Sequence, residues 1–386
     1  MKSYFPSQTV SDAEKISYDY GLKVGKAIEA EWFNNDKNSN RYKTNHNNFH
    51  NLRLYARGEQ SIQKYKDELS INGDLSYLNL DWKPVPIISK FVYISVNGIS
   101  DGTYDIKTYS QDPFGVAKRT EYMENILKDM RLKEFNAAVQ NEINLDVRKS
   151  NIEELPETND ELELHMQLSY KQSVEIAEEQ AINTLLEGSR YELIKKRFYY
   201  DITTIGIGAV KSSFNTSEGA IVEYVDPANL VYSYTESPYF EDIYYVGEVK
   251  TIPVNELAKQ FPHLSESDLE DIMKNKSFNR NNNNTRFSQD KEDTNTIQVL
   301  YFNYKTYMNE VYKMKETATG GDKAIEKDDD FNPPENKQGG YERVLRSIEC
   351  LYEGAMILGG DKLLKWEMAK NMMRPKSDFT KVKMNY

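Results

Sequence analysis

The chain is 386 residues long, which is enough for two or three domains, and it carries a formal net charge of −12. That charge argues against a general nucleic-acid binder, which would normally present a basic patch. Its one cysteine, Cys350, excludes an intramolecular disulfide and a cysteine-based metal cluster. No apolar run approaches the ~20 residues of a membrane helix, and the N-terminus has no apolar signal-peptide core, so we expect a protein that is cytosolic or assembled in the cytosol.

Tyrosine is unusually abundant, at 28 residues beside 15 phenylalanines. Its ring covers apolar surface while its hydroxyl keeps a polar partner, which suits contacts between subunits. The same abundance fits compositional drift in an AT-rich genome, which would also explain the many Asn, Lys and Ile residues. Both interpretations stay open.

The first third of the chain is predicted to be mostly helical. Residues 11–33 begin with a Ser-Asp cap and place one apolar stripe on a helix, namely Ile16, Tyr20, Val24, Ala27 and Ile28. A loop at 34–41 leads into a second helix that is expected to stop at Gly58. The apolar run 87–99 predicts a buried helix or strand, and the alternation in 101–111 predicts a strand.

Two long helices are predicted next. The first spans 112–150, where an aspartate cap is followed by a proline at the first helical position. The second is acidic, spans roughly 159–190 and is expected to end near Gly188. Residues 191–215 extend it and then pass through two glycines into a strand, and 220–227 would be the partner of that strand.

The remaining stretch alternates between strands and polar loops. Residues 239–262 predict a strand and then a short helix that ends at a proline, and a further helix is expected at 265–275. Residues 279–295 and 317–340 are polar and rich in Asn, Asp, Gly and Pro, so we expect loops with little packing. Residues 296–316 predict a long antiparallel strand.

Two more strands are expected in the last part of the chain, within 341–360, with a turn at Glu353-Gly354. Basic residues follow them and are candidates for contact with a partner or with DNA. They are Lys362, Lys365, Lys370, Arg374, Lys376, Lys381 and Lys383. The other interpretation is that these side chains simply solvate the ends of a β element.

Two histidines, His46 and His50, lie four residues apart, a spacing that would place both on one face of a helix. A zinc-protease motif needs a glutamate beside the first histidine, and Asn47 stands there instead. A metal-dependent nuclease or hydrolase that uses these histidines and nearby acids is therefore kept only as an alternative. The glycine pairs lack phosphate-loop spacing and Cys350 has no histidine partner, so the sequence predicts no active site, no cofactor and no bound metal.

The order of the elements resembles that of the portal, or head-to-tail connector, proteins of tailed bacteriophages, especially those of crAss-like and podovirus-type phages. No single motif is diagnostic, and the likeness lies in order and spacing. Four stretches carry it: LRLYARGEQ (52–60) followed by KPVPIISKFVYISVNGISDGTYDIKTYSQDP (83–113), DITTIGIGAVKSSFN (201–215), VDPANLVYSYTESPYFEDIYYVGEVKTIPVNELAKQFP (225–262), and TIQVLYFNYKT (296–306) paired with RVLRSIECLYEGAMILGGDKLL (343–364).

The resemblance implies an α+β fold with long wing helices, antiparallel β-sheet segments and a β-rich stem and clip region. Residues 1–111 would form an N-terminal helical segment that leads into the wing, 112–278 the wing domain, and 279–386 the part near the stem and clip. Portals of this type continue through a second stem helix and a crown. We therefore expect the protein to extend beyond FTKVKMNY (379–386).

The resemblance also implies a structural role without enzymatic activity. Portal subunits form a ring, typically of twelve copies, at one vertex of the virion, and DNA passes through it during packaging and ejection. The expected partners are further copies of the chain, the major capsid protein, the terminase motor, adaptor or tail proteins and the double-stranded genome, with no membrane. Assembly would take place in the bacterial host cytoplasm. Another head–tail structural protein, such as an adaptor or tail component, is the alternative.

Overall fold

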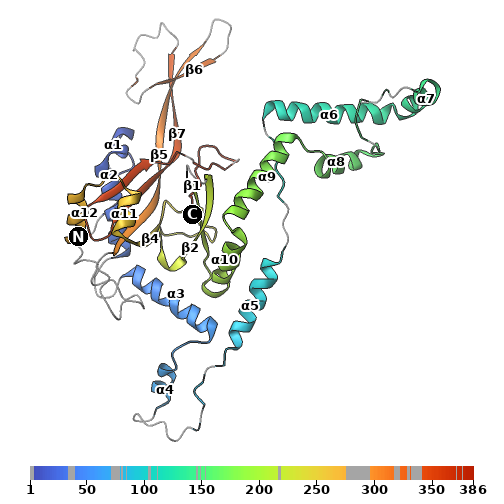
Figure 1. Ribbon diagram of the computed structural model, residues 1–386. Coiled ribbons are helices and arrows are strands. Elements are labelled where there is room, and N and C mark those ends of the chain that lie inside the picture. The colour runs from blue at the N-terminus through green and yellow to red at the C-terminus, as the bar shows by residue number, and fades with distance from the viewer. Residues whose placement is uncertain are drawn as a thin grey trace. The chain divides into compact units, whose positions relative to one another are not determined.

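The computed structural model describes residues 4–33, 40–70, 79, 81–83, 85–102, 106–110, 112–144, 147, 149–152, 154–215, 219–274, 296–316, 322–327, 331, 341–370, 372–375 and 377–386. The chain divides into two compact units, one made of Met1–Ser100 with Leu193–Tyr386 and the other of Asp101–Glu192. We call them the sheet unit and the helical unit (Figure 1). This division does not coincide with the predicted boundaries at 111/112 and 278/279.

The fold is mixed, with helices and antiparallel sheets, as the α+β prediction requires. The main sheet of the sheet unit has six strands in the order β3-β4-β5-β7-β8, with β6 paired to β5. These strands are β3 (Leu230–Tyr232), β4 (Tyr245–Pro253), β5 (Thr296–Glu316), β6 (Asp322–Lys327), β7 (Tyr341–Ile357) and β8 (Leu363–Met368). Strand β5 pairs with β4, β6 and β7. Its C-terminal half extends with β7 beyond the rest of the sheet as a long two-stranded ribbon, to which β6 is added (Figure 1).

Helices and a small hairpin complete the sheet unit. The helices are α1 (Asp12–Ile16), α2 (Tyr18–Trp32), α3 (Arg41–Arg57), α4 (Gln63–Leu69), α5 (Ile87–Ser100), α10 (Tyr191–Ile205, which begins in the helical unit), α11 (Val254–Gln260) and α12 (Glu266–Lys274). Strands β1 (Ala209–Asn215) and β2 (Gly219–Val225) form the hairpin, as predicted, and the short helix η1 (Pro227–Asn229) follows it. No helix in the described part of the chain is long and apolar enough to cross a membrane.

The main core lies between α2 and the sheet. The predicted stripe is buried at Tyr20, Val24, Ala27 and Ile28, but its first member, Ile16, is exposed because the helix breaks at Ser17. At the end of α2 the indole nitrogen of Trp32 donates a 2.9 Å hydrogen bond to the hydroxyl of Tyr245 on β4. The aromatic residues thus supply both apolar area and a buried polar contact.

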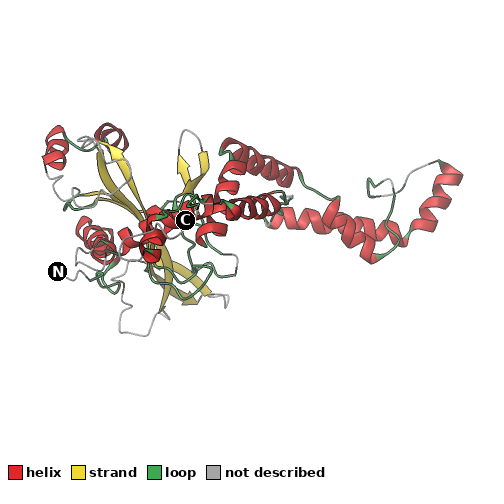
Figure 2. Cartoon of the chain, turned by 90° about the horizontal axis from the view of Figure 1, so that it is seen from below, coloured by secondary structure: helices red, strands yellow, loops and turns green. Residues whose placement is uncertain are grey.

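The helical unit contains α6 (Pro113–Arg131), α7 (Lys133–Ile143), α8 (Asn159–Leu168) and α9 (Ser173–Gly188), and its described residues include no strand (Figure 2). The predicted cap of the first long helix is present. Asp112 accepts hydrogen bonds from two backbone amides at the start of α6. The two long helices that the sequence predicted are each divided. Asp129 near the end of α6 is buried and accepts hydrogen bonds from Lys149 and Ser150, so the chain after α7 folds back onto α6.

The predicted strand at 101–111 is wrong for the residues that the structure describes, whereas 103–105 and 111 lie outside them. Residues 106–110 have no regular secondary structure, since their backbone groups bond to α9 instead of to a strand. The amides of Thr108 and Ser110 donate to the carboxylates of Glu179 and Glu175, at 3.2 and 2.9 Å. The backbone amides of this segment therefore bond to carboxylate side chains and not to a neighbouring strand.

Two predictions for the C-terminal sheet are also wrong. The loop predicted at 317–340 contains strand β6, although most of its other residues lie outside the described part, as do the predicted loops at 279–295 and 34–39. The turn predicted at Glu353-Gly354 does not exist, because β7 is one continuous strand. Gly354 is needed in that strand since the buried ring of Phe302, its partner on β5, lies against it.

We therefore expect Gly354→Ala to be destabilising. The added Cβ would lie 2.3 Å from Cζ of Phe302, whose ring is 1% exposed and has no space to move into. Overpacking of this kind costs about 2–3 kcal/mol. Urea unfolding would measure it beside Gly360→Ala, where the new Cβ meets its nearest atom at 3.7 Å. Equal stabilities of the two variants would contradict the prediction.

Candidate functional site

The best-organised polar cluster of the sheet unit surrounds Arg53 on α3. Its guanidinium donates to Asp201 of α10 from Nε and Nη2, at 3.1 and 2.9 Å. It also donates to Asp226, the residue that caps η1, from Nη1 and Nη2 at 3.0 and 2.8 Å. Tyr224 of β2 completes the cluster by donating its hydroxyl to Asp201. We call these four residues the Arg53 clasp.

The clasp is largely shielded from water, with the side chains of Arg53 and Asp201 17% and 2% exposed. Burial alone would raise the pKa of Asp226, but the hydrogen bonds from Arg53 and from the amide of Ala228 outweigh it and leave that pKa below its usual value. Burial and the bond to Asp201 raise the pKa of the Tyr224 hydroxyl. Both carboxylates of the clasp accept hydrogen bonds from one arginine, so the clasp joins α3, α10 and the turn at η1.

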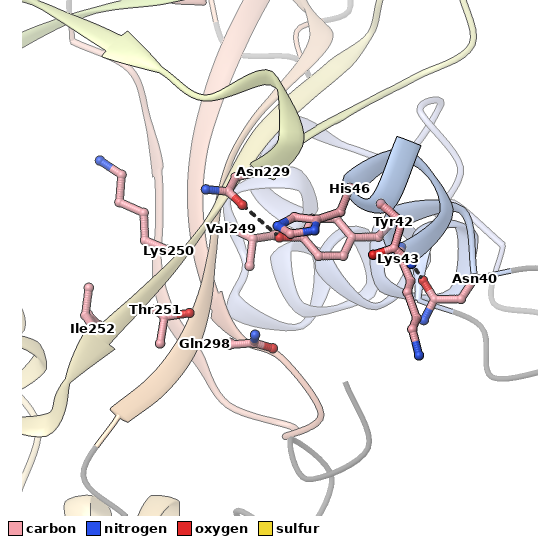
Figure 3. A pocket seen from close by; sticks show the side chains of 11 residues that line it. Asn40, Tyr42, Lys43, His46, Asn229, Val249, Lys250, Thr251, Ile252 and Gln298 are labelled. Carbon is pink, nitrogen blue, oxygen red and sulfur yellow. Dashed lines mark hydrogen bonds between the residues drawn. The ribbon is translucent and has the colours of Figure 1, made fainter. Parts of the chain in front are cut away.

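A pocket of about 460 Å³ lies beside the clasp, between the start of α3 and strand β4 (Figure 3). Tyr42 and His46 of α3 face Asn229 across it, and the Tyr42 hydroxyl donates a 3.2 Å hydrogen bond to the Asn229 side chain. Thr251 and Gln298 lie on the strand side, while Lys250 and Ile252 point away in Figure 3. The described lining residues include no carboxylate and no thiol, so these residues supply no general acid–base pair of carboxylates and no nucleophilic cysteine.

The two histidines do not form a recognisable metal centre. The His46 ring lies 6.1 Å from the ring of Tyr42 in a tilted arrangement, and Nε2 of His50 is buried. Among the residues that the structure describes, no group of three or more His, Cys, Asp or Glu side chains could hold a metal ion. Cys350 is buried in β7, and burial raises its pKa to about 12. A thiol with that pKa is not a nucleophile at neutral pH.

Six of the seven predicted basic residues are described, and their surroundings differ. Lys362 pairs with Asp268 of α12, and Lys365 pairs with Glu353 and Glu367 at 2.7 and 2.9 Å. Arg374 donates to the backbone carbonyls of Glu349 and Phe379 and so fastens the last segment to β7. Lys376 lies outside the described residues. Only Lys370, Lys381 and Lys383 are both described and well exposed, so these three are the members that could meet a partner.

The helical unit has a small core and a large uncovered apolar surface. Its buried cluster consists of Ile126, Leu162 and Met166 with a few partly buried neighbours. Many of its large apolar side chains are instead exposed, among them Phe114, Phe135, Ile143, Leu164, Leu168 and Val174.

No protein-family model matches this chain, and no curated protein is similar enough to count as a match. A function therefore has to be inferred from the chain's own residues and contacts. The clasp could not be predicted from the sequence, because Arg53 is about 150 residues or more from its two aspartates along the chain. The one available signal was the Asp-Pro pair at 226–227, which is typical of a capped turn.

We expect Arg53→Ala to destabilise the sheet unit by about 3–5 kcal/mol, because it leaves the buried carboxylate of Asp201 and the partly buried carboxylate of Asp226 without their cation. Arg53→Lys should be intermediate, since a single ammonium cannot span both aspartates. Arg57→Ala on the same helix is the control and should cost no more than ~1 kcal/mol. Denaturant unfolding checks all three, and a cost for Arg53→Ala as small as that of the control would rule out the clasp as a stabilising contact.

Proposed function

We propose that this chain is a structural subunit of a phage portal ring, which forms the channel for packaging and ejection of double-stranded DNA at one vertex of the virion. The observation that supports this most is the apolar surface that the helical unit leaves uncovered. A unit whose buried cluster has three members cannot cover side chains such as Phe114, Phe135 and Ile143 by itself. Identical neighbours in a ring would cover the same surface in every copy.

The wider portal assignment rests on the order of the elements described for the sequence. Under it we expect about twelve copies, with the major capsid protein, the terminase motor and adaptor or tail proteins as further partners. The net charge of −12 suits a conduit for DNA, because a strongly basic wall would retain the polyanion through counterion release. The ATPase activity of packaging would belong to the motor and not to this chain.

The test of this proposal is the assembly state of the whole gene product. Analytical ultracentrifugation and negative-stain electron microscopy should show a closed ring, since the uncovered apolar surface favours association. A monodisperse monomer at high concentration and moderate salt would overturn the proposal. A ring or tube of clearly different symmetry would favour an adaptor or tail component, the alternative within the same class.

The exposed lysines near the end of the chain supply a second test. We expect the double variant Lys381→Glu, Lys383→Glu to lower the amount of packaged DNA or the docking of the motor, because it reverses two charges that have solvent access. The isolated subunit should remain folded. Lys23→Glu, Lys259→Glu is the matched control, since it makes the same change of charge at exposed lysines of α2 and α11. Equal packaging by both double variants would show that Lys381 and Lys383 are solvated side chains without a partner contact.

A further inference from the structure

Helix α5 is apolar on almost every side, and only one line of it is buried. Val92, Val96 and Ser100 are the buried residues, and the two valines pack with Ala56 of α3 and against Tyr199 and Tyr200 of α10. The apolar run 87–99 predicted a buried element, and that prediction is wrong for the chain alone, where most of the large apolar side chains of α5 are exposed. A helix that is apolar all round is normally enclosed, so a covering partner is missing.

The uncovered side of α5 carries a regular pattern. At 100° per residue, Ile87, Phe91, Ile94 and Gly98 lie opposite the buried line, four, three and four residues apart. The first three side chains are 60%, 62% and 58% exposed, and a Cβ added at Gly98 would meet nothing within 4 Å. This is the spacing of a helix-packing seam, and a glycine in it permits close approach of a second backbone. We call these four residues the α5 seam.

We propose that a helix of a second copy of this chain covers the α5 seam and that this contact joins neighbouring subunits. The inference rests on the proposed function, because it assigns one of the contacts that the ring requires. The three large side chains of the seam, Ile87, Phe91 and Ile94, are 60%, 62% and 58% exposed. At roughly 150 Å² for each full side chain they present about 270 Å² of apolar surface.

That area is about a third of the ~800 Å² that each partner contributes to a stable interface of standard size, so other surfaces of the two copies would supply the rest. The only charge on the helix is Lys90, and the seam itself has none, which fits the uncharged centre of an interface. A second copy is the partner that is always present at the same concentration. It also carries helices with exposed apolar faces, such as α7 with Phe135 and Ile143.

The first experiment compares glutamate substitutions in the whole gene product. Phe91→Glu and, separately, Ile94→Glu should shift the assembly to monomers, because each places a charge in the seam. Phe214→Glu on β1 is the matched control, since Phe214 is the same residue type at 63% exposure in another place. Circular dichroism and thermal unfolding should be unchanged, as neither seam side chain belongs to a core cluster of its own chain. Rings formed by both seam variants as readily as by the control would overturn the inference.

A second experiment remains informative even if a glutamate variant fails to fold. Ile94→Cys can be labelled selectively with a maleimide fluorophore, because Cys350 is buried and its thiol pKa is raised. The emission of an environment-sensitive label should shift to the blue, and the label should become protected from an aqueous quencher, as the protein concentration rises through assembly. Protection that does not depend on concentration would show that the chain covers its own seam, and a label that stays exposed in the assembled state would show that nothing does. Either result overturns the proposal.

The two proposals fail in different ways. If the wild-type protein forms rings and the seam variants form them equally well, the seam is not a subunit contact but the portal function stands. If the wild-type protein forms only a dimer that Phe91→Glu and Ile94→Glu dissolve, the seam contact stands and the portal function fails. A wild-type protein that remains monomeric at every concentration would overturn both the seam contact and the portal function.

Discussion

The Arg53 clasp is the contact on which the arrangement of α3, α10 and η1 in the sheet unit depends. One guanidinium fork holds Asp201 of α10 and Asp226 at the η1 cap, so three segments that are far apart in the sequence meet at a single side chain. The planar fork can serve two carboxylates at once, whereas an ammonium acts as a point charge. Because Asp226 also accepts a 3.0 Å hydrogen bond from the amide of Ala228, the turn after β2 is fixed by the same cluster.

The Arg53 clasp also joins the two helices that contact α5, the helix of the proposed assembly surface. Ala56 lies three residues beyond Arg53 on α3 and packs with the buried line of α5. Tyr199 and Tyr200, which directly precede Asp201 on α10, pack against the same line. The helices that hold α5 are thus the two helices that the clasp joins. The direction in which the α5 seam faces is set by the Arg53 clasp together with the packing of Val92 and Val96 against these two helices.

The sequence predicted elements well where the signal is local. The Gly58 stop of α3, the Asp112 cap of α6, the β1–β2 pair and the strand-to-helix passage at 245–260 all follow from capping chemistry or residue periodicity, and all are present. Gly354 shows where such reasoning fails. A glycine between two apolar runs usually marks a turn, but here it makes room for Phe302, and that ring comes from a strand about fifty residues earlier.

The candidate contacts were harder to predict than the fold because their meaning depends on what each side chain meets in space. The basic residues after β7 look alike in sequence, yet their contacts differ. Lys362 and Lys365 form ion pairs with Asp268 and Glu353, whereas Lys381 and Lys383 are exposed. The apolar run of α5 likewise predicts burial, and the chain alone buries only one side of it. An apolar residue that its own fold leaves in water is destabilising unless another surface covers it. The mismatch between the pattern of α5 and its surroundings is therefore the observation on which the proposal of a second copy at the α5 seam rests.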